Sequence, residues 1–151
     1  MKARAGVRLH SLEVPLAGNT LLVPSAAVAE VINPIPFSPV PFSQPWLMGV
    51  IGWRTLAIPV ISLEVLLGVA PPAQTANGKI LVFYPMSGRH DWEFYGLLSI
   101  AEPRPQALDG SQPVAAESEL PDSPYIAAGL KIANRLMLIP DFEELKKIFY
   151  P

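Results

Sequence analysis

Short apolar segments separated by turn residues run along most of the chain. They are rich in Val, Ile, Leu and aromatic residues, as strands are. They comprise Leu12–Leu16, Thr20–Val23, Leu47–Trp53, Leu56–Ile61, Lys79–Tyr84, Trp92–Ile100, Leu130–Ala133 and Leu136–Ile139. Gly18-Asn19 is typical of a hairpin turn between the first two segments. The 18 prolines, spread throughout, leave little room for long helices. The pattern predicts an all-β fold.

Brief helical segments are predicted where a strand ends in a small polar residue. Ser62 is placed to cap a helix over Leu63–Leu67, and Gly68 is placed to end it. Ser25 similarly precedes Ala26–Ile32, whose apolar residues have the spacing of an amphipathic helical turn. Both helices are expected to be short connections within the β fold.

The last helix has the clearest start. Asp141 followed by Glu144 has the spacing of a capping box, in which each side chain accepts a hydrogen bond from a backbone N–H of the first turn. The sequence therefore predicts a helix over Phe142–Phe149.

An internal repeat would explain why a strand followed by a helical turn recurs. Ser25, Ser62 and Ser99 lie 37 residues apart (62 − 25 and 99 − 62). Coincidence among short apolar strings explains the spacing equally well. A true repeat would favour two similar small barrels over one sandwich.

Three stretches are predicted to be connections. Asn33–Pro45 is dense in proline and should be extended, with Phe37 and Phe42 seeking burial. A PxxP match within it would also suit a ligand for an SH3-type partner, although a packed connector is favoured. Pro103–Pro124 and the shorter Ala70–Gly78 are expected to be flexible.

Composition narrows the classes of function. Half of the 151 residues are hydrophobic, only 16% are charged, and the net charge is −2, without the basic excess expected of a nucleic-acid binder. The absence of cysteine excludes a disulfide scaffold, a thiolate metal site and a cysteine nucleophile. The basic N-terminus precedes an apolar stretch that Glu13 and Pro15 interrupt, so it is a poor export signal. We expect a cytoplasmic protein that is not inserted in a membrane.

No catalytic, metal-binding or cofactor-binding motif is found. The two histidines, His10 and His90, have no ligand spacing to each other or to a carboxylate pair. His90 and Asp91 adjoin a glycine in a loop, and a solvated turn explains them better than an acid–base pair. The Gly49–Gly52 segment lacks the lysine and the spacing of a phosphate loop. The sequence predicts a protein that is not an enzyme.

The segment from Trp46 to Arg54 is the most informative. As a strand it would be apolar on both faces, so it is either doubly buried or offers one face to a partner. Alternation separates Trp46, Met48, Val50 and Gly52 from Leu47, Gly49, Ile51 and Trp53. A core strand explains most of these residues, whereas Arg54 can offer its guanidinium to a partner. Trp53 and Arg54 are also the residue types that dominate binding hot spots.

Four blocks together resemble the CheW family of chemotaxis adaptors. Trp46–Leu67 (WLMGVIGWRTLAIPVISLEVLL) is similar to the family's central "LGVINLRG" and "PVIDL" strings. Leu21–Ile32 (LLVPSAAVAEVI) resembles "YAIPxxxVxEVI", and Tyr125–Leu145 (YIAAGLKIANRLMLIPDFEEL) resembles the closing "YIxGVAxxDGRLVxLLDLxxL". Lys79–Pro103 resembles the paired strands between them. The resemblance covers nearly the whole chain in order, which we expect of a complete family member.

The resemblance implies a single CheW-like domain over residues 1–151, made of two pseudo-repeated, SH3-like five-stranded barrels. It implies an adaptor without cofactor or catalysis. The partners would be the cytoplasmic tip of a methyl-accepting chemoreceptor and the regulatory domain of a CheA-type histidine kinase. Arg54 matches the family's arginine, and Val50 and Ile51 match the adjacent apolar positions associated with receptor contact. With Trp53, these residues form the predicted interaction site.

Departures from the family pattern put the choice of partner in doubt. Gly52, Thr55, Ser62 and Ser99 stand where the family has Asn, Gly, Asp and Asp. They suggest a divergent adaptor, for instance one serving a type IV pilus chemosensory system. Two other classes stay open, namely a small-ligand or peptide sensor on the same barrels, which needs a cavity lined by Trp and Tyr, and an enzyme of unknown type.

Overall fold

Two five-stranded sheets form the core of the protein. The computed structural model describes residues 8–72 and 77–149. In chain order its elements are β1 (Leu9–Pro15), β2 (Thr20–Pro24), η1 (Ser25–Ala27), β3 (Val28–Ile32), β4 (Leu47–Trp53), β5 (Leu56–Ile61), α1 (Leu63–Leu66), β6 (Lys79–Phe83), β7 (Tyr95–Ser99), β8 (Arg104–Leu108), η2 (Glu117–Glu119), β9 (Ile126–Ile132), β10 (Arg135–Pro140) and α2 (Phe142–Lys146). The predicted all-β class with two five-stranded units is confirmed.

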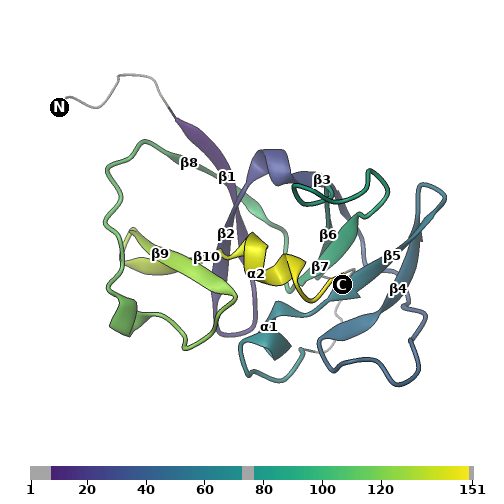
Figure 1. The fold of residues 1–151 in the computed structure, drawn as a ribbon. Coiled ribbons are helices and arrows are strands. Elements are labelled where there is room, and N and C mark those ends of the chain that lie inside the picture. Colours follow the sequence, from purple (N-terminus) through teal and green to yellow (C-terminus); the bar gives the residue numbers. More distant parts are fainter. Residues whose placement is uncertain (1–7, 73–76, 150–151) are drawn as a thin grey trace.

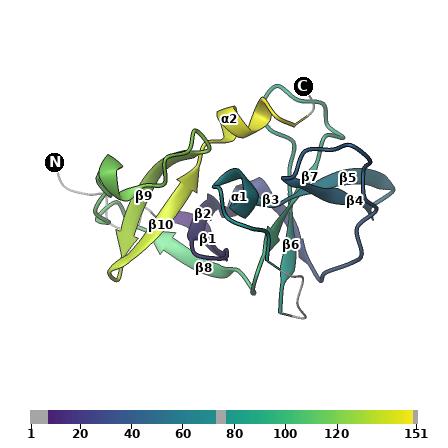
Figure 2. The same ribbon diagram turned by 90° about the horizontal axis from the view of Figure 1, so that it is seen from below.

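The chain passes between the two sheets twice. The first sheet has the order β8-β1-β2-β10-β9, and the second has the order β3-β6-β7-β5-β4. Each sheet contains one parallel pair, β2 with β10 in the first and β5 with β7 in the second, among antiparallel neighbours. The two ends of the chain therefore complete one barrel, and the middle forms the other (Figure 1). Seen from below, the barrels lie side by side, with α1 and α2 over their junction (Figure 2).

Alternation along the strands builds a shared core between the sheets and a second core inside one of them. On β6, Leu81 and Phe83 join the larger cluster, which combines residues of both sheets. Ile80 and Val82 face the other way, into a cluster formed by the second sheet. Because successive side chains of a strand point to opposite faces, a strand buried on both faces reads as a continuous apolar run.

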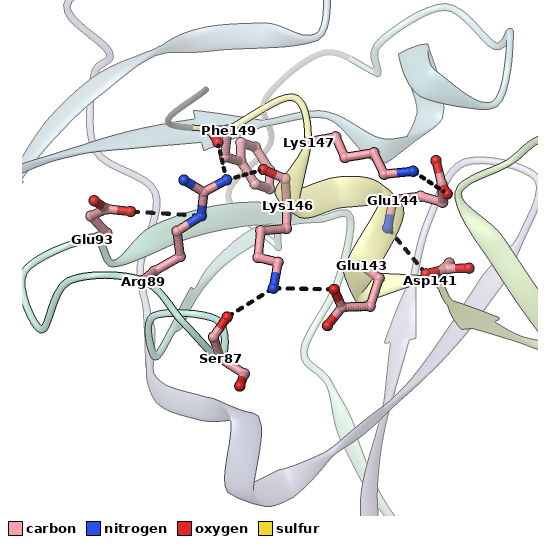
Figure 3. Close-up of polar contacts among 9 residues, drawn as sticks. All are labelled: Ser87, Arg89, Glu93, Asp141, Glu143, Glu144, Lys146, Lys147 and Phe149. Carbon is pink, nitrogen blue, oxygen red and sulfur yellow. Dashed lines mark hydrogen bonds and ion pairs between the residues drawn. The ribbon is translucent and has the colours of Figure 1, made fainter.

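The end of the chain ties one barrel to the other (Figure 3). Arg89, in the loop between β6 and β7, donates to the carbonyl oxygens of Lys146 and Phe149, at 2.6 and 3.3 Å. Lys146 Nζ donates to Ser87 O in the same loop, at 2.9 Å. The Phe149 ring stacks on Tyr95 of β7, with centroids 5.0 Å apart. We call these contacts of Ser87, Arg89, Lys146 and Phe149 the C-terminal clamp.

Two predicted helices differ from those observed. The helical turn expected over Ala26–Ile32 is only the three-residue η1, after which Val28, Val31 and Ile32 belong to β3. β-Branched side chains favour the extended backbone, and pairing with β6 supplies the hydrogen bonds that a helix would have made internally. The final helix is shorter than predicted, because α2 ends at Lys146.

Ser62 caps α1 as predicted, whereas only one half of the capping box predicted for α2 is observed. Ser62 Oγ accepts a hydrogen bond from Val65 N–H at the beginning of α1. Asp141 accepts one from Glu144 N–H at 3.1 Å, but its own N–H donates to Tyr125 O, and the Glu144 carboxylate accepts from Lys147 Nζ instead. Ser99, the third position of the 37-residue spacing, precedes no helix, since its hydroxyl bonds instead to backbone carbonyls.

The predicted connections are more ordered than their composition indicated. Pro103–Pro124 was expected to be flexible, yet it contains β8, which pairs with β1 from Leu9 to Glu13. Proline is tolerated there because β8 is an edge strand. Phe37 packs against the second cluster as expected, whereas Phe42 is fully exposed. Of the connection at 70–78, residues 73–76 lie outside the described residues.

Candidate functional site

The hairpin of β4 and β5 carries the predicted interaction site. Its turn consists of Arg54 and Thr55, with φ angles of 45° and 67°. Two successive positive φ values are typical of the type I′ turn, whose twist matches that of the flanking strands. The strands pair up to Trp53 and Leu56. Arg54 is thus held at the tip of a regular hairpin.

The Arg54 side chain is exposed, but its contacts restrain its conformation. Its side chain is 66% exposed, and its guanidinium carbon lies 4.6 Å from the centroid of the Trp53 ring. Its Nη2 lies 3.2 Å from Glu30 Oε1, and Trp53 Nε1 donates to the same oxygen at 3.1 Å. A guanidinium that is stacked on one side and hydrogen-bonded on another has lost part of its rotamer freedom before any partner binds.

The contact with Glu30 also closes the second barrel. Glu30 lies on β3 and Trp53 on β4, which are the two end strands of that sheet. Their side chains meet through the hydrogen bond from Trp53 to Glu30. Nothing in the local sequence indicated this pairing, because the two residues are 23 positions apart and belong to strands that do not pair.

The other predicted site residues lie at different depths. Ile51 and Trp53 are 3% and 7% exposed and belong to the core of the second sheet. Val50 is half-buried, and its backbone exchanges two hydrogen bonds of 2.9 Å with Ser38. Arg54 is therefore the member of the set with a largely accessible side chain, Val50 is accessible in part, and the other two support the surface from beneath.

The proline-rich connection covers part of the outer edge of β4. The bridge between Ser38 and Val50 brings it so close to Gly49 that a Cβ there would lie 2.7 Å from Phe37 Cβ. Beyond this bridge, Val40 and Phe42 are exposed to solvent. Phe42 was expected to be buried, and its positive φ of 59° in a turn directs it outward instead. Exposed aromatic residues beside a strand edge are typical of interaction surfaces.

Comparison with known proteins agrees with this architecture. The family model described as a CheW-like domain matches residues 10–148. The chain belongs to the CheW-like domain family. A crystal structure of the scaffolding protein TtCheW from Thermoanaerobacter tengcongensis superposes with a TM-score of 0.77 at 17% sequence identity, covering 93% of this chain and 89% of that one. At that identity the likeness establishes the fold. No curated protein sequence gives a significant match.

Titratable side chains of this CheW-like chain are dispersed. In residues 8–72 and 77–149, no three His, Cys, Asp or Glu side chains come together as metal ligands would. His90 is exposed and stacks on Trp92, with ring centroids 5.3 Å apart. Burial raises the pKa of the Tyr95 hydroxyl far above its usual value. None of the helices in the described ranges has the length and apolar character needed to span a bilayer.

Two of the buried carboxylates, those of Glu13 and Glu64, hold parts of the fold together. Glu13 receives both of its hydrogen bonds from Arg135, at 3.0 and 3.1 Å. Glu64 accepts from Ala17 N–H and from the Ser62 hydroxyl, each at 3.1 Å, and so joins α1 to the first hairpin. Buried polar groups are normally hydrogen-bonded in this way. These contacts give the burial of Glu13 and Glu64 a structural reason, so neither carboxylate indicates a catalytic group.

Proposed function

We propose that this chain is a non-catalytic, cytoplasmic adaptor that couples chemoreceptors to a CheA-type histidine kinase in a chemosensory array. Membership of the CheW-like family, whose proteins are scaffolds and adaptors, supports the class of function. The observation that carries the proposal is the exposed Arg54 guanidinium, held over Trp53 and against Glu30 at the tip of the β4–β5 hairpin. It occupies the position of the family's arginine in the motif.

The proposed mechanism is positional. The cytoplasmic helical tip of a receptor lays apolar side chains against Val50 and hydrogen-bonds the remaining donors of Arg54. Because Arg54 is already restrained, less conformational entropy is lost on binding. The regulatory domain of the kinase docks elsewhere, through exposed strand edges. The adaptor transmits the signal by holding the two proteins in register, and no bond is made or broken.

A charge reversal with a matched control tests the proposal. Arg54→Glu should abolish capture of a receptor tip while leaving the urea midpoint within the range of an exposed substitution. Arg104→Glu makes the same change of charge on the exposed residue that begins β8, in the other barrel, and should retain capture. Equal capture by the two variants would remove Arg54 from the receptor site.

The alternative, a small-ligand or peptide sensor on the same barrels, has less support. It requires a cavity lined by Trp and Tyr. The apolar hollow of about 220 Å³ at the end of the first barrel is lined by residues such as Leu9, Leu22, Leu108 and Ile139, and it contains neither aromatic type. Such a hollow offers a ligand few polar groups for orientation.

A further inference from the structure

The outer edge of β9 is only half covered. β9 is an end strand of the first sheet, and one isolated bridge, from Val114 to Leu130, is found on its outer side. There, Ala115 N–H donates to Gly129 O at 2.8 Å, after which the chain turns away into η2. In the described part of the chain, no strand lies beside the outer edge of Ile126–Ala128. An uncovered edge can accept a further strand.

A groove lined by both polar and apolar residues runs beside this edge. It encloses about 570 Å³, and Val114, Leu120 and Ile126 are among its lining residues. Val114 is 72% exposed and contributes apolar surface beside the groove. Leu120 is seated directly over Gly129, where a Cβ would lie 2.6 Å from Leu120 Cδ2. The groove is therefore built by a close approach of the loop to the strand.

The charge of the groove is negative. Glu117 and Asp122 line it, and both are exposed. Neither has an ion-pair partner among residues 8–72 and 77–149. The nearby cation, Lys131, is already paired with Glu119 at 2.7 Å. Two uncompensated carboxylates beside an uncovered strand edge favour a ligand that is both extended and cationic.

We propose that this groove binds an extended, basic segment of a protein partner, which adds as a strand to Ile126–Ala128. Backbone hydrogen bonds to the strand edge would supply affinity, as in other strand-addition complexes. Lysine or arginine side chains would pair with Glu117 and Asp122, and apolar ones would cover Val114. This surface goes beyond the proposed receptor site, because β9 and the β4–β5 hairpin lie at opposite ends of the molecule (Figures 1 and 2).

A designed peptide can test the surface without knowledge of the natural partner. The probe is a capped seven-residue peptide of alternating lysine and valine, titrated into the isotope-labelled full chain. The same peptide with glutamate in place of lysine is the control. We expect the lysine peptide to bind saturably and the glutamate peptide not to bind. Changes in amide NMR chemical shift should be confined to residues 113–123 and 126–129. Raising the salt concentration should weaken it, because exposed charges are screened.

Charge-reversal variants complete the test. The double variant Glu117→Lys/Asp122→Lys should bind the lysine peptide about tenfold more weakly or not at all. The control is Asp91→Lys. Asp91 is exposed, lies in the other barrel and has no salt-bridge partner among the described residues, so this variant should bind the lysine peptide like the wild type. The proposal is overturned if the lysine peptide shows no saturable binding at about 1 mM. It is equally overturned if the shifts lie elsewhere, if the glutamate peptide binds as well, or if the double variant binds normally. Since Arg54 plays no part here, loss of receptor capture in Arg54→Glu would leave these outcomes unchanged.

Discussion

Removal of Arg89 should separate the contribution of the C-terminal clamp from that of the apolar core. The 2.6 Å bond to Lys146 O is a short, charge-assisted hydrogen bond, a class that contributes about 1.5–3 kcal/mol. The 3.3 Å bond to Phe149 O is longer and weaker. Replacement by methionine retains most of the apolar stem but removes every donor. We therefore expect Arg89→Met to lose about 2–3 kcal/mol of unfolding free energy.

The clamp also holds a buried carboxylate. Glu93 is 5% exposed, and its Oε2 has no hydrogen-bond partner, with Arg89 Nε at 4.0 Å. Without the arginine, the salt bridge of this charge that remains among residues 8–72 and 77–149 is with the exposed His90, also at 4.0 Å. A buried charge left without a partner is destabilising. Adding Glu93→Gln to Arg89→Met should therefore recover part of the lost stability.

Urea unfolding followed by circular dichroism measures both effects. Arg104→Met is the matched control, because Arg104 is exposed on an edge strand and should change stability by no more than about 0.5 kcal/mol. Faster amide exchange at Ile148 and Phe149, both of which donate to Leu145 O, should accompany the loss in Arg89→Met. If Arg89→Met were as stable as the control, the C-terminal segment would be held by Phe149 packing and the Lys146–Ser87 hydrogen bond without Arg89, and the reasoning would fail.

Three further predictions concern the core. Gly49→Ala places a Cβ 2.7 Å from Phe37 Cβ at a φ of 151° and should lower the free energy of unfolding by about 2–4 kcal/mol. Gly52→Ala, whose Cβ would have nothing within 4 Å, should be nearly neutral in the same denaturation assay. Glu64→Ala removes the acceptor of two hydrogen bonds of 3.1 Å and should cost about 2–3 kcal/mol, with a smaller loss in Glu64→Gln; equal losses would show that the acceptor is unimportant. Burial raises the pKa of Tyr95, so the folded state retains a proton that the unfolded state releases near pH 10. The contribution of Tyr95 to the free energy of unfolding is therefore full below that pH and falls above it by up to about 1.4 kcal/mol per pH unit. Tyr95→Phe should flatten this alkaline loss, and an unchanged slope would contradict the assignment.

Strand positions could be predicted from the sequence wherever apolar runs are bounded by turn residues. The hairpin at Gly18-Asn19 and the strand leading to Trp53 follow from local rules of burial and turn geometry. β3 was mistaken for a helix because the spacing of Val28, Val31 and Ile32 suits both structures, and only pairing with the distant β6 decides between them. Short apolar segments are ambiguous in this way.

The geometry around the proposed interaction site was predictable in part. The motif drew attention to Arg54, and the exposure of that residue agrees with a surface role. The support from Glu30 was not foreseen, because it depends on closure of a barrel by strands far apart in the sequence. The exposure of Phe42 was also missed, since hydrophobicity alone predicts burial. The ring is directed outward by a backbone turn, with a positive φ at Phe42, that hydrophobicity does not reveal.

Assembly of a ternary complex tests the central claim most directly. A receptor cytoplasmic tip is immobilised, and retention of the soluble regulatory domain of a CheA-type kinase is measured with and without this chain. We predict that the kinase domain is retained in a manner that depends on the concentration of the wild-type chain and is lost with Arg54→Glu. Retention that is the same without the chain, or binding of the chain to neither protein, would contradict the account.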